Sequence, residues 1–123
     1  MRRNGVSVYV TAPNEAEAVA ISRALVGERL AACVNILGPI RSLYWWDGSM
    51  HDEREVAFIA KTRASLLPKL TARVKQLHSY ECPCIVATPI TGGNADFVKW
   101  LFAQTSSRPK RTWTRRAFPK VGK

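Results

Sequence analysis

The chain has 123 residues, of which 46% are hydrophobic and 23% charged, a balance typical of one folded domain with no room for a second. No run of 18 apolar residues is present, and the first residues lead into an alternating apolar segment unlike the core of a signal peptide, so we expect neither a membrane span nor a secreted precursor. Three cysteines without the spacing of a disulfide framework favour a reducing compartment, and we expect a cytoplasmic protein.

The net charge of +10 is unevenly distributed along the chain. Seven of the 19 basic residues lie between Arg108 and Lys123, where there is no acidic residue, whereas residues 1–104 carry the other twelve against nine acids. We therefore divide the chain into a domain at 1–105 and a basic, flexible tail at 106–123. The tail also holds Trp113 and Phe118, a composition suited to nucleic-acid contact, and a solvating or subunit-embracing arm is the alternative.

The first half of the chain predicts a strand, a helix and a longer strand. Residues 6–10 are rich in valine, and the turn that follows contains Pro13, which suits the first turn of a helix over about 14–30. Residues 32–46 alternate, with an interruption at Gly38-Pro39 that predicts a bulge or bend. The side chains expected on one face of this strand are Ala32, Val34, Ile36, Ile40, Tyr44 and Trp46.

The second half begins with Asp47-Gly48, a strong signal for a hairpin turn, so a second long strand should follow over 51–63. Ser65 is a candidate N-cap for the next helix, whose expected buried face comprises Leu67, Leu70, Val74 and Leu77. A strand at 84–90 and a cap at Asn94 then precede a short last helix. Its expected apolar face consists of Phe97, Trp100 and Leu101.

The order βαββαβ with a short C-terminal helix predicts an α+β, ferredoxin-like sandwich, with an antiparallel sheet and two helices on one face. The two central strands are much longer than usual, so their hairpin should project beyond the sheet. Its tip carries Tyr44, Trp45 and Trp46, and exposed aromatic side chains on unpaired strands invite association. We therefore expect a closed homo-oligomer with Tyr44 and Trp45 at the interface.

Five segments in this order resemble the CutA family of divalent-ion tolerance proteins: Val10-Thr11-Ala12-Pro13, residues 28–35, Ser42-Leu43-Tyr44-Trp45-Trp46-Asp47-Gly48, Lys61-Thr62, and His78-Ser79-Tyr80-Glu81-Cys82-Pro83. The resemblance extends over about residues 5–104. It implies a ferredoxin-like subunit, a homotrimer built around the long hairpins, and a link to copper and other divalent cations. It brings no well-established enzymatic activity, and it implies an architecture similar to the PII signalling proteins.

At two positions this sequence differs from the residues that are common in the family it resembles. Ser79 stands where the family commonly has a proline, and Cys84 stands where it has an acidic residue. A carboxylate site transferred whole from the family is therefore not expected here.

A candidate metal site combines soft ligands. Cys82 and Cys84 lie two residues apart at the predicted start of a strand, which would direct both sulfurs to one face, and His78 could approach them. Two thiolates and an imidazole suit Cu(I), and Cys33 could join from the sheet or from another subunit. The alternative is that these are buried structural thiols.

A second candidate is a cleft between subunits that holds a small anionic or metal ligand. The resemblance implies that Lys61, Tyr80 and Glu81 lie around this cleft. We expect Glu55 and Trp46 to line it as well. The alternative is a solvated strand face for Glu55 and Lys61, and a packing role for the tryptophan.

No motif for nucleophilic, zinc-dependent or phosphate-transfer catalysis is present, so we expect no enzyme. The leading hypothesis is a non-enzymatic homotrimer of divalent-cation tolerance that binds a cation such as copper at or near clefts between subunits. The alternative is a PII-like signalling or interaction module that binds a small metabolite there.

Overall fold

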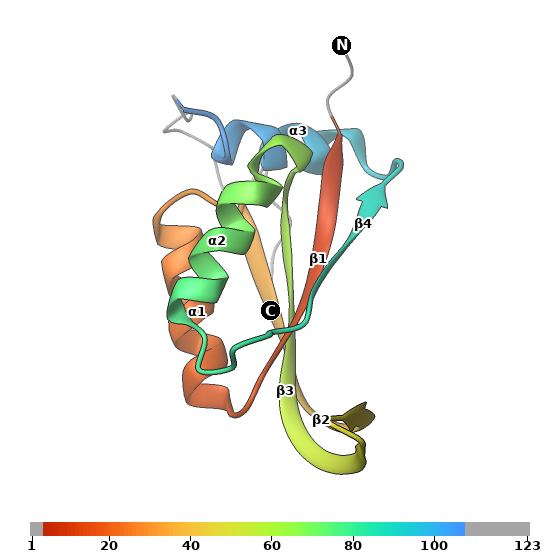
Figure 1. The fold of residues 1–123 in the computed structure, drawn as a ribbon. Helices are drawn as coiled ribbons and strands as arrows, with labels where there is room; N and C mark the ends of the chain where they lie inside the picture. Colours follow the sequence, from red (N-terminus) through yellow and green to blue (C-terminus); the bar gives the residue numbers. More distant parts are fainter. Residues whose placement is uncertain (1–3, 108–123) are drawn as a thin grey trace.

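The computed structural model describes residues 4–107, which form one antiparallel sheet and three α-helices (Figure 1). The sheet has the strand order β2-β3-β1-β4. The elements are β1 (Gly5–Ala12), α1 (Glu15–Gly27), β2 (Cys33–Trp46), β3 (Ser49–Arg63), a 3₁₀ turn (Ala64–Leu66), α2 (Leu67–Leu77), β4 (Ile85–Ile90) and α3 (Ala95–Gln104).

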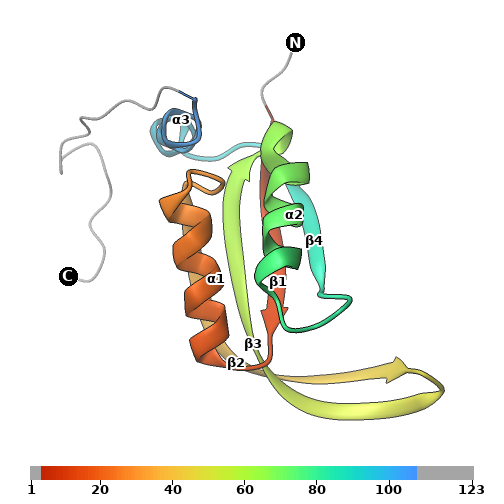
Figure 2. The same cartoon turned by 60° about the vertical axis from the view of Figure 1, so that its left-hand side comes forward.

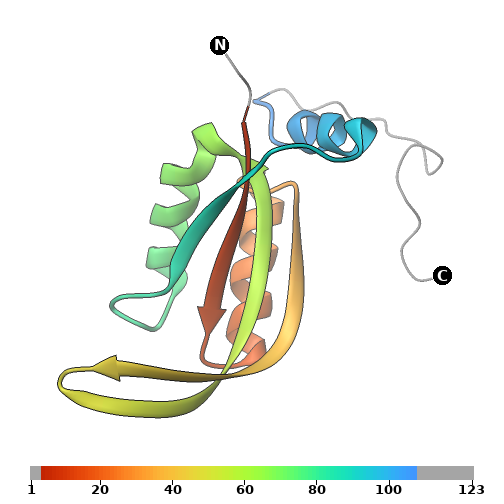
Figure 3. The ribbon, with the colours of Figure 1, turned by 90° about the vertical axis from the view of Figure 1, so that its right-hand side faces the viewer.

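The predicted fold class is confirmed: the elements follow the order βαββαβα, and α1 and α2 cover the same face of the sheet (Figure 2). Among residues 4–107, no helix covers most of the opposite face, and α3 lies across one end of the sheet (Figure 3). None of the helices within 4–107 is long and apolar enough to cross a membrane. Most of the predicted tail, residues 108–123, lies outside the described residues.

The core lies between the sheet and the two helices. Alternate residues of β1 and β3, such as Val8, Val10 and Phe58, turn toward α1 and α2 and are fully buried against Leu25 and Leu70. This period-two burial follows from strand geometry, in which successive side chains point to opposite faces. The intervening residues of β1 and β3 therefore lie on the face of the sheet that α1 and α2 do not cover.

Two predictions for the first helix need correction. Pro13 precedes α1 and does not lie in its first turn, because Asn14 is the N-cap and its side chain accepts a hydrogen bond from the Glu17 amide at 2.9 Å. The helix ends at Gly27, three residues earlier than expected, since Arg29 takes a left-handed φ of 63° and the chain reverses there.

The predicted cap of α2 is also wrong. Ser65 lies in a 3₁₀ turn, and Leu66 occupies the N-cap position without a side-chain hydrogen bond. The expected buried face of α2 holds for Leu70 and Val74, but Leu77 at the end of the helix is exposed. In α3, Phe102 is buried beside Leu101 and was not predicted, while Phe97 and Trp100 are only half-buried.

A β-bulge in β2 changes the face on which its side chains lie. Ile36 pairs with Phe58 of β3 and Gly38 pairs with Ala57, so Leu37 is the extra residue and the register shifts by one. Before the shift Ile36 shares the helix-covered face with Phe58, but after it the even-numbered residues pair with Glu55, Glu53 and His51 on the opposite parity. The predicted single face is therefore wrong: Ile40, Tyr44 and Trp46 lie opposite Val34 and Ile36.

The hairpin projects as predicted. The ladder between β1 and β3 ends at the pair Ala12–Val56, so residues 49–55 of β3 pair only with β2. The tip is a two-residue turn in which Asp47 and Gly48 both have positive φ, 53° and 78°. The paired strands curve away from the body of the sheet (Figure 3).

The bulge predicts that alanine substitutions at two glycines change the free energy of unfolding differently. A Cβ at Gly38 or at Gly27 would meet no atom within 4 Å, but only Gly38 has a positive φ, 103°. We expect Gly38→Ala to lower the free energy of unfolding by about 1–2 kcal/mol through backbone strain. Gly27→Ala should be neutral or raise it by up to about 1 kcal/mol. Urea unfolding at equal protein concentration measures both, and similar effects of the two substitutions would contradict the assignment.

Candidate functional site

A groove of about 980 Å³ lies between the projecting hairpin and the segment that joins α2 to β4. The lining residues come from β1 (Tyr9, Thr11), from β2 (residues 40–46), from β3 (Glu55) and from the joining segment (residues 80–84).

Glu55 is the most buried charged side chain in this groove, with 8% of its surface exposed. The Tyr80 hydroxyl donates to Glu55 Oε2 at 3.0 Å. Across residues 4–107, none of the ion pairs of the structure involves Glu55. The sequence placed Glu55 and Tyr80 at one site, and the structure brings them into direct contact.

A second phenol and carboxylate pair lies beside the first. The Tyr44 hydroxyl donates to Glu53 Oε1 at 3.2 Å, and the Tyr44 ring stacks on His51 with 5.4 Å between the centroids. Burial is the main cause that raises the pKa of Tyr80 far above its usual range, and the hydrogen bond to Glu55 raises it further. Desolvation, together with the negative charge of Glu53, raises the pKa of Tyr44. Both tyrosines therefore stay protonated near neutral pH and act as hydrogen-bond donors.

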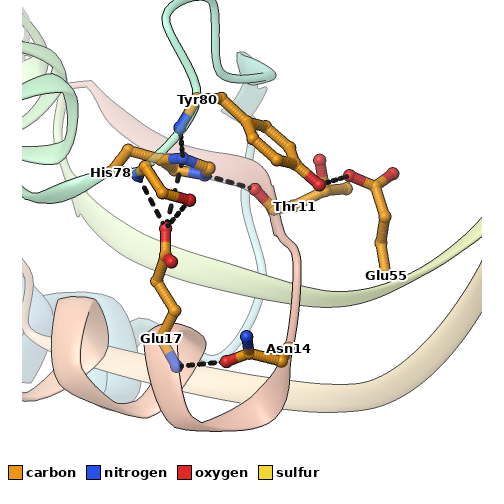
Figure 4. A network of polar contacts seen from close by, with 7 residues as sticks. Thr11, Asn14, Glu17, Glu55, His78 and Tyr80 are labelled. Carbon is orange, nitrogen blue, oxygen red and sulfur yellow. Dashed lines mark hydrogen bonds and ion pairs between the residues drawn. The ribbon is translucent and has the colours of Figure 1, made fainter.

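The segment that carries Tyr80 is held by a polar network around His78 (Figure 4). His78 is buried, its Nε2 lies 2.7 Å from the Thr11 carbonyl oxygen, and its Nδ1 lies 3.0 Å from the Tyr80 backbone nitrogen. A neutral imidazole protonated on Nε2 satisfies both contacts, because Nε2–H donates to Thr11 and Nδ1 accepts from Tyr80. His78 thereby ties Tyr80 to the end of β1.

Glu17 of α1 anchors the same segment from the other side. Its Oε2 accepts from the Ser79 backbone N–H at 2.8 Å and from the Ser79 hydroxyl at 3.0 Å. A proline at position 79, which the resemblance would place there, has neither donor. The serine thus gives this chain a contact with α1 that the common family residue cannot make. Glu17 and Ser79 lie 62 residues apart in the chain, so no local sequence pattern predicts this contact.

The predicted metal ligands are not gathered into a site within one chain. Over residues 4–107, no three His, Cys, Asp or Glu side chains lie close enough together to hold a metal ion. Cys82 and Cys84 precede β4 instead of starting it, both exposed, and both nitrogens of His78 already have partners. Cys33 is half-buried on the sheet, and burial raises the pKa of its thiol, an effect that Lys61 partly offsets.

Lys61 does not belong to the groove. It lies on β3 six residues from Glu55, roughly 20 Å along the strand, and its ammonium group donates to Asn35 Oδ1. Trp46 and Glu81 do line the groove, together with Tyr9, Thr11 and Ile40, which were not predicted as site residues. The β1–β3 pairing brings Tyr9 and Thr11 there, and the bulge brings Ile40. The Gly38-Pro39 interruption predicts a bulge or bend, but it does not say on which face Ile40 then lies.

Comparison with known proteins identifies the family. The family described as CutA1 divalent ion tolerance protein matches residues 6–104. This chain belongs to the CutA1 family. The divalent-cation tolerance protein CutA of Thermus thermophilus is 46% identical over 98 residues, which cover 80% of this chain and 95% of that protein. The chloroplastic CutA 1 of rice is 45% identical over 78% of this chain, but the match spans only 54% of the rice protein.

Solved CutA1 structures share the fold. The Thermus thermophilus protein superposes with a TM-score of 0.81 at 44% identity and covers 83% of this chain and 99% of its own. The rice protein gives a TM-score of 0.82 at 42% identity, with coverages of 85% and 95%. The resemblance drawn from the sequence motifs is therefore confirmed.

The Tyr80–Glu55 bond predicts a dependence of stability on alkaline pH. The raised pKa of Tyr80 means that the folded chain holds this proton more tightly than the unfolded chain. Its contribution to stability is fully present below the unfolded pKa of about 10 and is lost as the pH rises toward the folded pKa. Between about pH 9 and about pH 11, the free energy of unfolding should fall more steeply for the wild type than for Tyr80→Phe. Urea unfolding at several pH values measures this, and parallel curves would contradict it.

Proposed function

We propose that this protein is a non-enzymatic homotrimer of divalent-cation tolerance, which binds copper at or near clefts between subunits in a reducing, cytoplasmic compartment. Its membership of a family described by divalent ion tolerance supports the role. The observation that carries the assembly is the sheet face that no helix of residues 4–107 covers, together with the two edges left unpaired in that part of the chain. The unpaired cysteines Cys33, Cys82 and Cys84 are consistent with the compartment.

Within the described residues, the sheet has an exposed face, unpaired edge strands and an exposed hairpin. Its helix-free face exposes apolar side chains such as Tyr9 and Val86. Its edge strands, β2 and β4, each have one side unpaired within the described residues. The projecting hairpin exposes Leu43 and 73% of Trp45. Packing against identical subunits would cover these surfaces, and three copies about one axis would leave no free edge.

Copper binding is proposed at the exposed thiols. Cys82 and Cys84 are two soft ligands separated by one residue, and thiolates favour Cu(I). A neighbouring subunit would have to supply further ligands, because one chain does not provide three.

Light scattering and a copper titration test the two parts of this proposal separately. The reduced protein at micromolar concentration should have about three times the chain mass of 13.7 kDa, and a folded monomer would overturn the assembly. The titration should show copper uptake that Cys82→Ser and Cys84→Ser both reduce. The matched control is Thr88→Ser, on the exposed part of β4, which should leave uptake unchanged. Uptake that is absent, or unaffected by both cysteine variants, would overturn direct binding.

The groove supports a second candidate function, a PII-like module that binds a small metabolite. Its volume of about 980 Å³ lies at the upper end of the range for small-molecule sites, and it combines aromatic walls with a few polar groups. Mass spectrometry of the native protein should detect a retained small molecule that Glu55→Gln releases. A wild-type protein that carries no ligand and binds none in titrations would count against this function.

A further inference from the structure

The ring of His78 is enclosed within a single chain, so its contacts do not depend on the assembly. Its side chain has no exposed surface, and a neighbouring subunit can therefore add no contact to the ring. The groups that face it are the Thr11 carbonyl of β1, the backbone and phenol ring of Tyr80, and the Glu17 carboxylate of α1. Of these groups, Glu17 alone is charged near neutral pH.

The partners of the two ring nitrogens define the protonation state of His78 in the structure. Thr11 offers a carbonyl oxygen, which only accepts, so Nε2 at 2.7 Å must carry a proton. Tyr80 offers a backbone N–H, which only donates, so Nδ1 at 3.0 Å must be unprotonated. The imidazole is therefore neutral whenever it accepts from the Tyr80 backbone (Figure 4).

A carboxylate lies beside the unprotonated nitrogen. Glu17 Oε2 is 3.4 Å from Nδ1, and while the ring is neutral there is no proton between the two atoms. A proton added at Nδ1 would make this nitrogen a donor, so the Tyr80 N–H could no longer bond to it, whereas Glu17 could accept from it. The buried cation would then be paired with a carboxylate and would keep its contact with Thr11, as a buried charge requires. The two protonation states thus select different partners for Nδ1.

We propose that His78 is a pH-sensitive switch for the segment that joins α2 to β4. The neutral ring holds the Tyr80 backbone at the end of β1. When the ring takes up a proton from solvent, Nδ1 exchanges Tyr80 for Glu17, and the segment is released at that amide. Residues 80–84 of this segment form one wall of the groove, so acidification loosens that wall. The switch requires neither copper nor a ligand in the groove.

Nuclear magnetic resonance of the isotope-labelled, full-length protein between about pH 8 and about pH 5 tests the switch. The ring nitrogen signals of His78 should show the Nε2–H tautomer at the high end and the doubly protonated ring at the low end. Over the same transition, the protection of the Tyr80 amide from hydrogen exchange, corrected for the intrinsic rate, should fall by about tenfold, because one hydrogen bond is lost. His51→Gln identifies the signals of the other histidine of the chain.

Three variants separate the switch from a general effect of acid. Glu17→Gln keeps an oxygen that can accept from Ser79 but removes the charge that favours the protonated ring, so the transition should move to lower pH. The matched control is Glu15→Gln, at an exposed position in the same helical turn, which should leave the transition unchanged. His78→Asn can accept from the Tyr80 N–H but does not titrate, so it should abolish the pH dependence of that amide.

Thermal melts and light scattering at each pH would establish that the variants fold and assemble like the wild type. The switch would be overturned by a ring that stays neutral throughout the titration or by a Tyr80 amide whose protection does not follow the ring. A transition at the same pH in Glu17→Gln and in the wild type would overturn it as well. These results concern the switch alone, since the experiment contains neither copper nor a metabolite.

Discussion

One register shift, at Ile36 and Gly38 of β2, determines what the groove contains. If β2 continued past Ile36 without this shift, the side chains that share the face of Glu55 would be Arg41, Leu43 and Trp45. The shift instead places Ile40, Tyr44 and Trp46 on the same face as that carboxylate. The positive φ of Gly38 permits this local geometry, because an L-residue with a side chain would be strained there.

The opposite wall of the groove depends on polar contacts and not on a strand. The segment after α2 has no ladder partner in the part of the chain that the structure describes, so its position comes from His78, held at Thr11, and from Ser79, held at Glu17. These contacts connect the ends of β1 and α2 to the first turn of α1. The hydroxyl of Tyr80 is thereby directed at Glu55, and the most buried acid of the groove obtains its hydrogen bond.

The fold that this chain shares with its CutA1 relatives places two chemically different groups beside one groove. The Thermus and rice CutA1 proteins share the fold of this chain and are 46% and 45% identical to it over the aligned residues. The thiols before β4 and the carboxylate at Glu55 border one groove but differ in chemistry. Soft ligands suit a copper ion, whereas the carboxylate accepts a hydrogen bond from the Tyr80 hydroxyl.

The sequence by itself determined the order of elements, the hairpin turn at Asp47-Gly48, the length of the central strands and the family, because these follow from local periodicity, turn chemistry and contiguous motifs. It also placed Glu55, Tyr80, Glu81 and Trp46 at one site. Only the tertiary structure decided that Lys61 lies elsewhere, that His78 is fully engaged, and that Tyr9 and Thr11 join the site. Such facts depend on strand register and on contacts between residues far apart in the chain, which no local pattern records.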